Sequence, residues 1–174
     1  ILVSGGGRCN FTNLHAKPAD YVSTNPAFVP YALSQFKPKD FIAIVKAKGI
    51  PFHEKKDGQL FCDKSAKAIL DLLVERAEKN GVTLLKDQKT REVTHADGIF
   101  TVQTQTASYS AAKLVVATGG LSWPQLGSTD LGFQIAKQFG LKIIEPSPAL
   151  AGLTFPPSEM VRFDGLSGVH LDSV

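Results

Sequence analysis

Several residue types are scarce in this sequence, and each shortage excludes a class of protein. The 174 residues include only two cysteines. Cys9 and Cys62 lie far apart and form no CxxC motif, which excludes a disulfide framework and a zinc knuckle and leads us to expect a reducing, cytoplasmic compartment. No apolar run is long enough to span a membrane, so we expect no membrane partner.

Positive side chains outnumber negative ones only slightly. The chain carries 19 Lys and Arg against 16 Asp and Glu, a net charge of +3. The lysines are scattered along helical stretches without interleaved aromatic residues, so we expect a small-molecule substrate and no nucleic acid. The four histidines show no metal-ligand spacing, and we predict no metal site.

The chain is comparatively rich in glycine, and its first cluster stands at the start, in "ILVSGGGRCNFTN". Residues 1–3 have the pattern of a buried strand, and Gly5, Gly6 and Gly7 follow. Glycine reaches positive φ easily, so the run predicts a loop whose amides cradle an anion, with Arg8 adding a guanidinium. A plain glycine-rich turn with capping polar residues is the alternative. GxxxxGK is absent, which excludes a P-loop.

A second cluster follows an apolar segment in "LVVATGGLSWPQLGSTD". We predict a strand over residues 113–117, with Thr118, Gly119 and Gly120 at its carboxyl end. Open α/β sheets bind ligands in the crevice beyond the carboxyl ends of their strands. The alternative is a tight strand-to-loop turn that binds nothing.

Hydrophobic periodicity and turn residues predict the remaining elements. The predicted helices cover residues 31–36, 40–48, 64–80 and 128–139. A hairpin is predicted over 50–63 with its turn at Asp57-Gly58, followed by a short strand at 82–85 and a meander of extended runs over 93–116. This order predicts an α/β fold in three layers, in which the meander replaces a crossover helix.

Three segments, "SGGGRCNFTN", "GQLFCD" and "VVATGGLSWPQLGST", together resemble a family of bacterial NAD(P)/FAD-dependent oxidoreductases. This flavoprotein family is also called aminoacetone-oxidase-like and includes bile-acid dehydro-intermediate reductases. The resemblance implies a partial Rossmann-like FAD-binding domain of the glutathione-reductase-like type over residues 1–145. It also implies that an inserted β-rich domain starts at 146–174, and that a GxGxxG unit precedes residue 1 in a longer protein. The family's GDG segment is replaced here by Asp130, Leu131 and Gly132.

The cofactor contacts are likewise implied by the resemblance. Along the pyrophosphate and flavin edge of FAD it places Ser4, Gly5, Gly6, Gly7, Arg8, Cys9 and Asn10. Thr118, Gly119 and Gly120 would meet the ADP side, and the backbone near Lys89 would meet the adenine. The expected function is an FAD-dependent oxidoreductase in full-length form, with NAD(P)H as a candidate electron donor. A flavin- or nucleotide-binding module without turnover is the alternative, and the catalytic residues, substrate and oligomeric state stay open.

Overall fold

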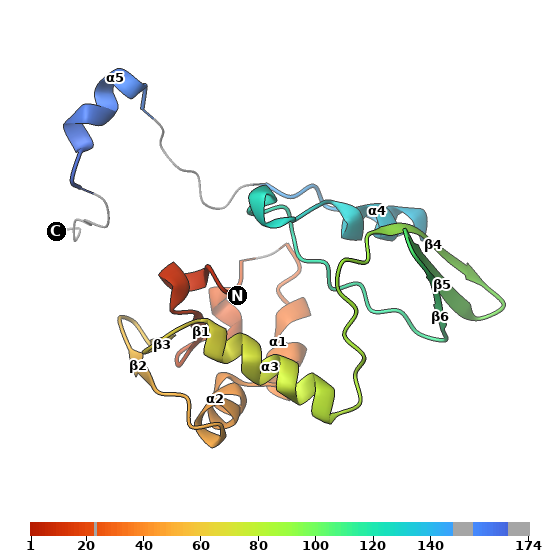
Figure 1. Ribbon diagram of the computed structural model, residues 1–174, viewed down its shortest axis with the longest axis horizontal. Coiled ribbons are helices and arrows are strands. Elements are labelled where there is room, and N and C mark those ends of the chain that lie inside the picture. Colours follow the sequence, from red (N-terminus) through yellow and green to blue (C-terminus); the bar gives the residue numbers. More distant parts are fainter. Residues whose placement is uncertain (23, 148–154, 167–174) are drawn as a thin grey trace. The chain divides into compact units, whose positions relative to one another are not determined.

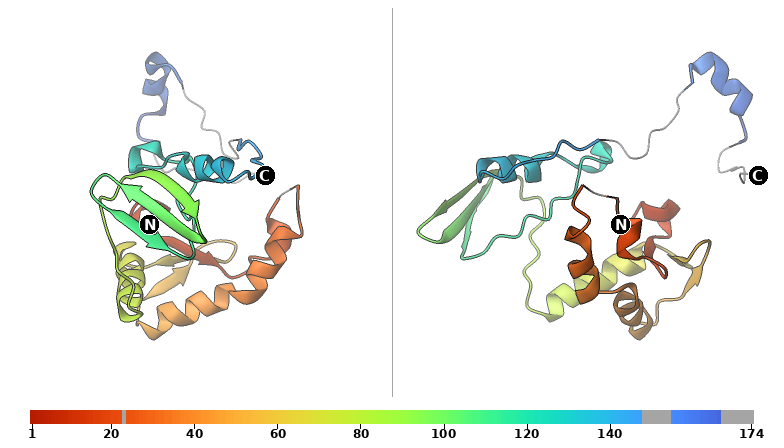
Figure 2. Two further views of the ribbon diagram at one scale, coloured as in Figure 1. Left: turned by 90° about the vertical axis from the view of Figure 1, so that its right-hand side faces the viewer. Right: turned by 180° about the vertical axis from the view of Figure 1, so that it is seen from behind.

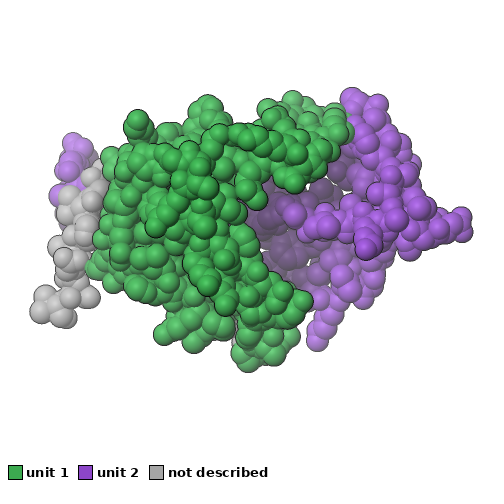
Figure 3. All heavy atoms as spheres, turned by 90° about the horizontal axis from the view of Figure 1, so that it is seen from below, with its two compact units in different colours: residues 1–88 green, residues 89–174 purple. Residues whose placement is uncertain are grey.

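The computed structural model describes residues 1–22, 24–147 and 155–166 of the chain. They divide into two compact units, Ile1–Gln88 and Lys89–Val174, which Figure 3 shows in separate colours. Part of the tail that we predicted to open a second domain lies outside the described residues. The domain boundary between residues 145 and 146 stays a prediction.

The first unit combines a small sheet with helices (Figure 1). Its elements in chain order are η1 (Ser4–Gly7), β1 (Asn10–Asn13), η2 (Pro18–Asp20), α1 (Phe28–Gln35), α2 (Pro38–Ala47), β2 (Phe52–Glu54), β3 (Gln59–Cys62) and α3 (Lys67–Lys79).

The sheet of this unit is antiparallel, with the order β1-β3-β2. The β2–β3 hairpin confirms the prediction for residues 50–63, and its turn has Asp57 at φ 51° and Gly58 at φ 78°. These two consecutive positive φ angles form a tight turn that the Gln59 amide closes by donating to the Lys56 carbonyl at 3.0 Å, which explains the Asp-Gly pair. The hairpin brings β3 next to β1 and so next to the glycine loop.

The predicted helices of this unit also form, with shifted ends. Pro38 begins α2, and Asp40 Oδ2 accepts a hydrogen bond from the Lys37 amide at 2.7 Å. Gly49, at φ 71°, and Gly81, at φ 73°, follow the ends of α2 and α3, as glycine does when a helix closes in the left-handed conformation.

One core joins the loop, the sheet and both long helices. Its buried residues are Cys9, Val45, Cys62, Ala66, Ile69 and Leu72. Phe11, Phe41 and Phe52 pack against them, and the ring centroids of Phe11 and Phe52 lie 5.3 Å apart, edge to face. Because Cys9 and Cys62 belong to this core, packing fixes both the end of the glycine loop and the end of β3.

The second unit is built on the predicted meander. Its elements are β4 (Thr90–Ala96), β5 (Ile99–Thr104), β6 (Ser108–Ala111), η3 (Pro124–Leu126), α4 (Leu131–Gln138), α5 (Pro157–Met160) and η4 (Val161–Phe163). The three strands lie side by side in sequence order and pair antiparallel (Figure 2). Helix α4 confirms the predicted helix near residues 128–139, and its Gln138 Nε2 donates to the Val93 carbonyl at 2.5 Å.

Three predicted strands do not form. Residues 1–3 make a turn, and residues 82–85 and 113–117 have no strand pairing. Their apolar side chains are exposed instead, with Leu2 53%, Val82 52% and Val115 85% accessible. An apolar run becomes a strand only where a neighbouring strand accepts its hydrogen bonds. Both sheets of the described residues are antiparallel and are built from other segments. The described residues form both helices and strands, so the predicted α/β class is right. The placement of these three strands is wrong.

Candidate functional site

The run of glycines forms a tight loop with unusual backbone angles. Gly5, Gly6 and Gly7 all have positive φ, at 56°, 64° and 82°. Only glycine adopts such a succession without strain, so the sequence of the loop follows from its shape. Arg8 returns to φ −103°, and Cys9, at φ 54°, is left-handed again with a side chain present.

Backbone hydrogen bonds hold the loop against β3 and α3. The Cys62 amide donates to the Arg8 carbonyl at 3.0 Å, and the Ala66 amide donates to the Gly7 carbonyl at 2.7 Å. The Cys9 amide donates to Ser4 O at 2.9 Å. These hydrogen bonds position the inner side of the loop against secondary structure.

The outer side of the loop is open. A Cβ at Gly6 would meet no atom within 4 Å, whereas a Cβ at Gly5 would lie 2.7 Å from the Asn10 amide nitrogen and from a Phe61 ring carbon. Arg8 is exposed, and no carboxylate within the described part of the chain pairs with its guanidinium. Gly6 and Arg8 therefore offer a ligand direct access to backbone and to a free cation.

The amides that follow the loop serve the sheet. In the orientation that satisfies its bonds, the Asn10 side chain donates to Thr12 O at 3.1 Å and Leu60 O at 3.3 Å. Asn13 Nδ2 donates to Asp57 O at 2.9 Å. These contacts tie β1 to the hairpin, and they explain both amides without any ligand.

The second predicted segment lies in the other unit. Thr118, Gly119 and Gly120 are exposed, and a Cβ at Gly119, which has φ 77°, would meet no atom within 4 Å. Thr118 Oγ1 packs closely on α4, since a Cβ at Gly132 would lie 2.6 Å from it. Thr118 and Gly119 border an apolar hollow of about 600 Å³ that Phe100 helps to line. Lys89 O accepts from the Gln105 amide at 3.2 Å, within the meander.

The two cysteines have a structural role in this arrangement. Both thiols are free and buried. Burial raises the pKa of Cys62 above its usual value, and the neighbouring Cys9 and Asp63 raise it further. A raised pKa disfavours the reactive thiolate, so the pattern is that of packing residues.

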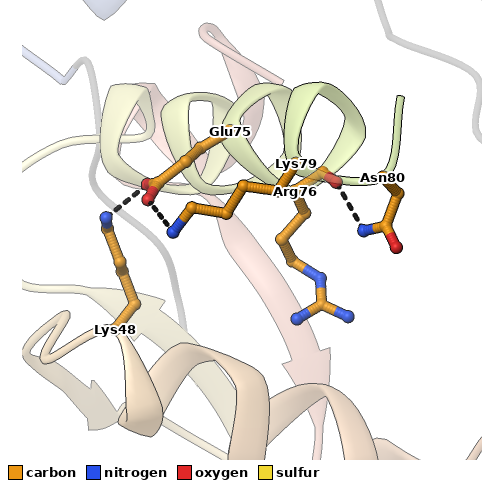
Figure 4. Close-up of polar contacts among 5 residues, drawn as sticks. All are labelled: Lys48, Glu75, Arg76, Lys79 and Asn80. Atoms are coloured by element: carbon orange, nitrogen blue, oxygen red, sulfur yellow. Dashed lines mark hydrogen bonds and ion pairs between the residues drawn. The ribbon is translucent and has the colours of Figure 1, made fainter. Parts of the chain in front are cut away.

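A cluster of cations that sequence reasoning missed lies between α2 and α3. We call it the basic groove: Lys48, Arg76 and Lys79 surround a hollow of about 190 Å³ whose floor includes Ile44 and Leu72. Glu75 receives hydrogen bonds from Lys48 and, at 2.7 Å, from Lys79 Nζ (Figure 4). These lysines lower the pKa of Glu75 to about 2.

We expect Glu75→Gln to remove a pH-dependent part of the stability of this unit. Because the folded-state pKa of Glu75 is depressed, its stabilisation is complete above the unfolded pKa, near 4.5, and is lost as the pH falls toward about 2. The carboxylate is exposed, so the effect is small. Urea denaturation of the full-length protein at pH 7 and pH 3 measures it. An equal difference from wild type at both pH values would contradict the assignment.

Comparison with known proteins gives the class to which this fold and these glycine segments belong. The model of the family described as "HI0933-like protein Rossmann domain" matches residues 1–174, so the chain belongs to that family. The Rossmann-type class predicted from the glycine segments is thereby confirmed, as is an α/β fold.

Two curated bacterial proteins are similar to the chain over nearly all of its length. The chain is 44% identical over 174 residues to an Escherichia coli protein named ribosomal RNA dihydrouridine synthase, covering all of this chain and 44% of the relative. A Haemophilus influenzae protein of the same name is 42% identical over 175 residues, which cover 98% of this chain and 43% of the relative. The chain therefore spans less than half the length of these relatives.

A more distant relative supports the resemblance stated from the motifs. A Clostridium scindens 3-dehydro-bile acid delta(4,6)-reductase is 25% identical over 155 residues, 88% of this chain and 37% of the relative. All three relatives bear the names of enzymes, which supports an enzymatic full-length protein.

The expectation that nucleic acid is no partner is wrong. Two relatives are named for an activity on ribosomal RNA. The whole-chain net charge also hides an uneven distribution, because residues 1–88 carry thirteen Lys and Arg against nine Asp and Glu, while residues 89–174 carry six against seven. A net charge computed for each unit would have revealed the basic one.

No helix among the described residues is long and apolar enough to cross a membrane.

Proposed function

We propose that this chain is the part of a flavoprotein oxidoreductase that binds FAD, and that the full-length protein forms dihydrouridine in ribosomal RNA. The observation that carries the proposal is the 44% identity, over the whole of this chain, to a protein of that name. The glycine loop adds a physical reason, because its open backbone at Gly6 and the unpaired Arg8 suit the negative pyrophosphate of a dinucleotide.

The residues of the two glycine segments have separate roles in this proposal. Ser4 to Asn10 bind along the pyrophosphate and flavin edge, and Thr118 to Gly120 bind the ADP side, with the backbone near Lys89 at the adenine. When bound, FAD reduced by NAD(P)H, the proposed donor, would supply the hydride that, together with a proton, saturates the C5–C6 double bond of uridine. The chain's own contribution is to bind and orient the cofactor.

We expect Arg8→Ala in the full-length protein to weaken FAD binding by about tenfold to hundredfold. It removes a charged donor whose contact contributes about 1.5–3 kcal/mol. Lys64→Ala is a control of similar exposure outside the loop. Apoprotein of wild type and of each variant is titrated with FAD, and the change in flavin fluorescence gives each affinity for FAD. Equal affinities for Arg8→Ala and wild type would remove Arg8 from the cofactor site.

The proposed activity has its own test. Full-length protein is incubated with FAD, NADPH and unmodified ribosomal RNA, and digested nucleosides are analysed by mass spectrometry. We expect NADPH-dependent dihydrouridine. FAD binding with NADPH oxidation but no dihydrouridine would support an oxidoreductase with another substrate, as the name of the C. scindens relative suggests. FAD binding without NADPH oxidation would favour the binding module without turnover.

A further inference from the structure

The basic groove between α2 and α3 carries an excess of positive charge that the protein itself does not neutralise. Lys48 and Lys79 share the single carboxylate of Glu75. Arg76 extends from α3 toward α2, and no carboxylate of the described chain pairs with its guanidinium (Figure 4). Three cations against one carboxylate leave the lining of the groove with a net charge of +2.

Glu75 organises this cluster. It accepts hydrogen bonds from Lys48, which follows α2, and from Lys79 of α3, and both lysines lower its pKa to about 2, so it stays ionised even in mildly acidic solution. The carboxylate therefore holds the two ammonium groups beside the hollow, where their remaining N–H donors face solvent. A cluster organised in this way has lost part of the side-chain entropy that binding would otherwise remove.

The floor of the groove is apolar. Half-buried Ile44 and exposed Ala47 on α2 line it together with Leu72 on α3, which is buried in the core. A polyanion with apolar faces, such as a nucleic-acid strand with its sugars and bases, matches both parts of this surface. An acidic peptide would match the rim alone.

We propose that the basic groove binds the phosphodiester backbone of the RNA on which the full-length protein acts, with Arg76 and Lys79 contacting phosphates and a ribose or base lying against Ile44 and Ala47. The choice of RNA as the polyanion rests on the proposed function. The groove belongs to neither predicted cofactor segment, and the first unit that contains it carries the chain's excess of positive charge, a net +4.

The test uses full-length protein and a fluorescein-labelled single-stranded RNA of mixed sequence, with binding followed by anisotropy over a range of KCl concentrations. The variant Arg76→Gln/Lys79→Gln removes two cations from the groove. The matched control Lys64→Gln/Lys67→Gln removes two cations near the other end of α3, where Lys67 pairs with Asp71 as Lys79 does with Glu75. Equal melting temperatures show that both variants are folded.

We expect the groove variant to bind RNA about tenfold more weakly than the control. The logarithm of the association constant decreases as the logarithm of the salt concentration rises. The magnitude of this slope should be smaller by about 0.7 for each phosphate that the variant no longer neutralises. Arg76→Glu should weaken binding further by repulsion. The proposal is overturned if the groove variant keeps the affinity and slope of the control. It is also overturned if the groove variant loses polyglutamate binding while keeping RNA binding, since the partner would then be an acidic protein.

This binding assay needs neither FAD nor turnover, so its outcome is separate from that of the proposed function. Groove-dependent RNA binding without dihydrouridine formation would keep the groove and reject the proposed activity. Dihydrouridine formation with RNA binding that does not depend on the groove would keep the proposed activity and reject the groove as the RNA-binding surface.

Discussion

Gly5→Ala is expected to destabilise the first unit by about 2–6 kcal/mol. The substitution combines a left-handed conformation with overpacking, and each contributes about 1–3 kcal/mol. Its Cβ would lie 2.7 Å from the backbone nitrogen of Asn10 and 2.7 Å from the Phe61 ring, and Gly5 already has φ 56°. The nitrogen belongs to β1, which pairs with β3, so the clash cannot be relieved by a side-chain rotation.

Gly6→Ala is the matched control for this substitution. Gly6 has a similar φ of 64°, and a Cβ there meets nothing within 4 Å. Only the conformational term remains, at about 1 kcal/mol. Urea denaturation of the full-length protein, stripped of cofactor, measures both variants. Equal destabilisation by the two variants would show that the loop does not pack against β1 and β3 as described.

Gly119→Val is expected to lower FAD affinity by more than a hundredfold while changing stability far less. Gly119 has φ 77° and open space around it, so a valine there strains the backbone and places two methyl groups where the proposed ligand approaches. Within the described part of the chain, no protein atom beyond the adjacent residues lies within 4 Å of a Cβ at this position. A large loss of affinity would therefore come from the cofactor.

Gly98→Val is the control that separates a loss of FAD affinity from a loss of stability. Gly98 lies in the β4–β5 turn, with φ 75° and no atom within 4 Å of a Cβ, so its backbone strain is similar. FAD titration and thermal unfolding of both full-length variants give the comparison. If both variants lose stability equally and both retain FAD, Gly119 is a turn glycine and the proposed ADP contact is withdrawn.

Local signals predicted most of the elements correctly. The Asp57-Gly58 hairpin, the helices closed by Gly49 and Gly81, and the meander around Asp97-Gly98 all form. In each case the determining interaction lies within a few residues, because a positive φ or a helix end is decided by the local sequence. The α/β class followed from the order of these elements, whereas the family came from the resemblance of three sequence segments.

The errors arose where a long-range partner decides the outcome. The strands predicted at residues 82–85 and 113–117 depend on neighbours that their own sequence cannot specify. The helix α3 was predicted correctly, but which of its apolar residues are buried depends on packing: Ile69 and Leu72 are buried, whereas Leu73 is 39% exposed. The basic groove was missed for the same reason, since Lys48 meets Arg76 and Lys79 only after α2 and α3 have packed.

The absorption spectrum of purified full-length protein tests the central claim most directly. We predict that the protein carries stoichiometric FAD, or binds it when added to apoprotein, with the yellow absorption of an oxidised flavin that NADPH bleaches in the absence of oxygen. A colourless, folded full-length protein that does not bind added FAD would contradict the account, whatever its affinity for RNA.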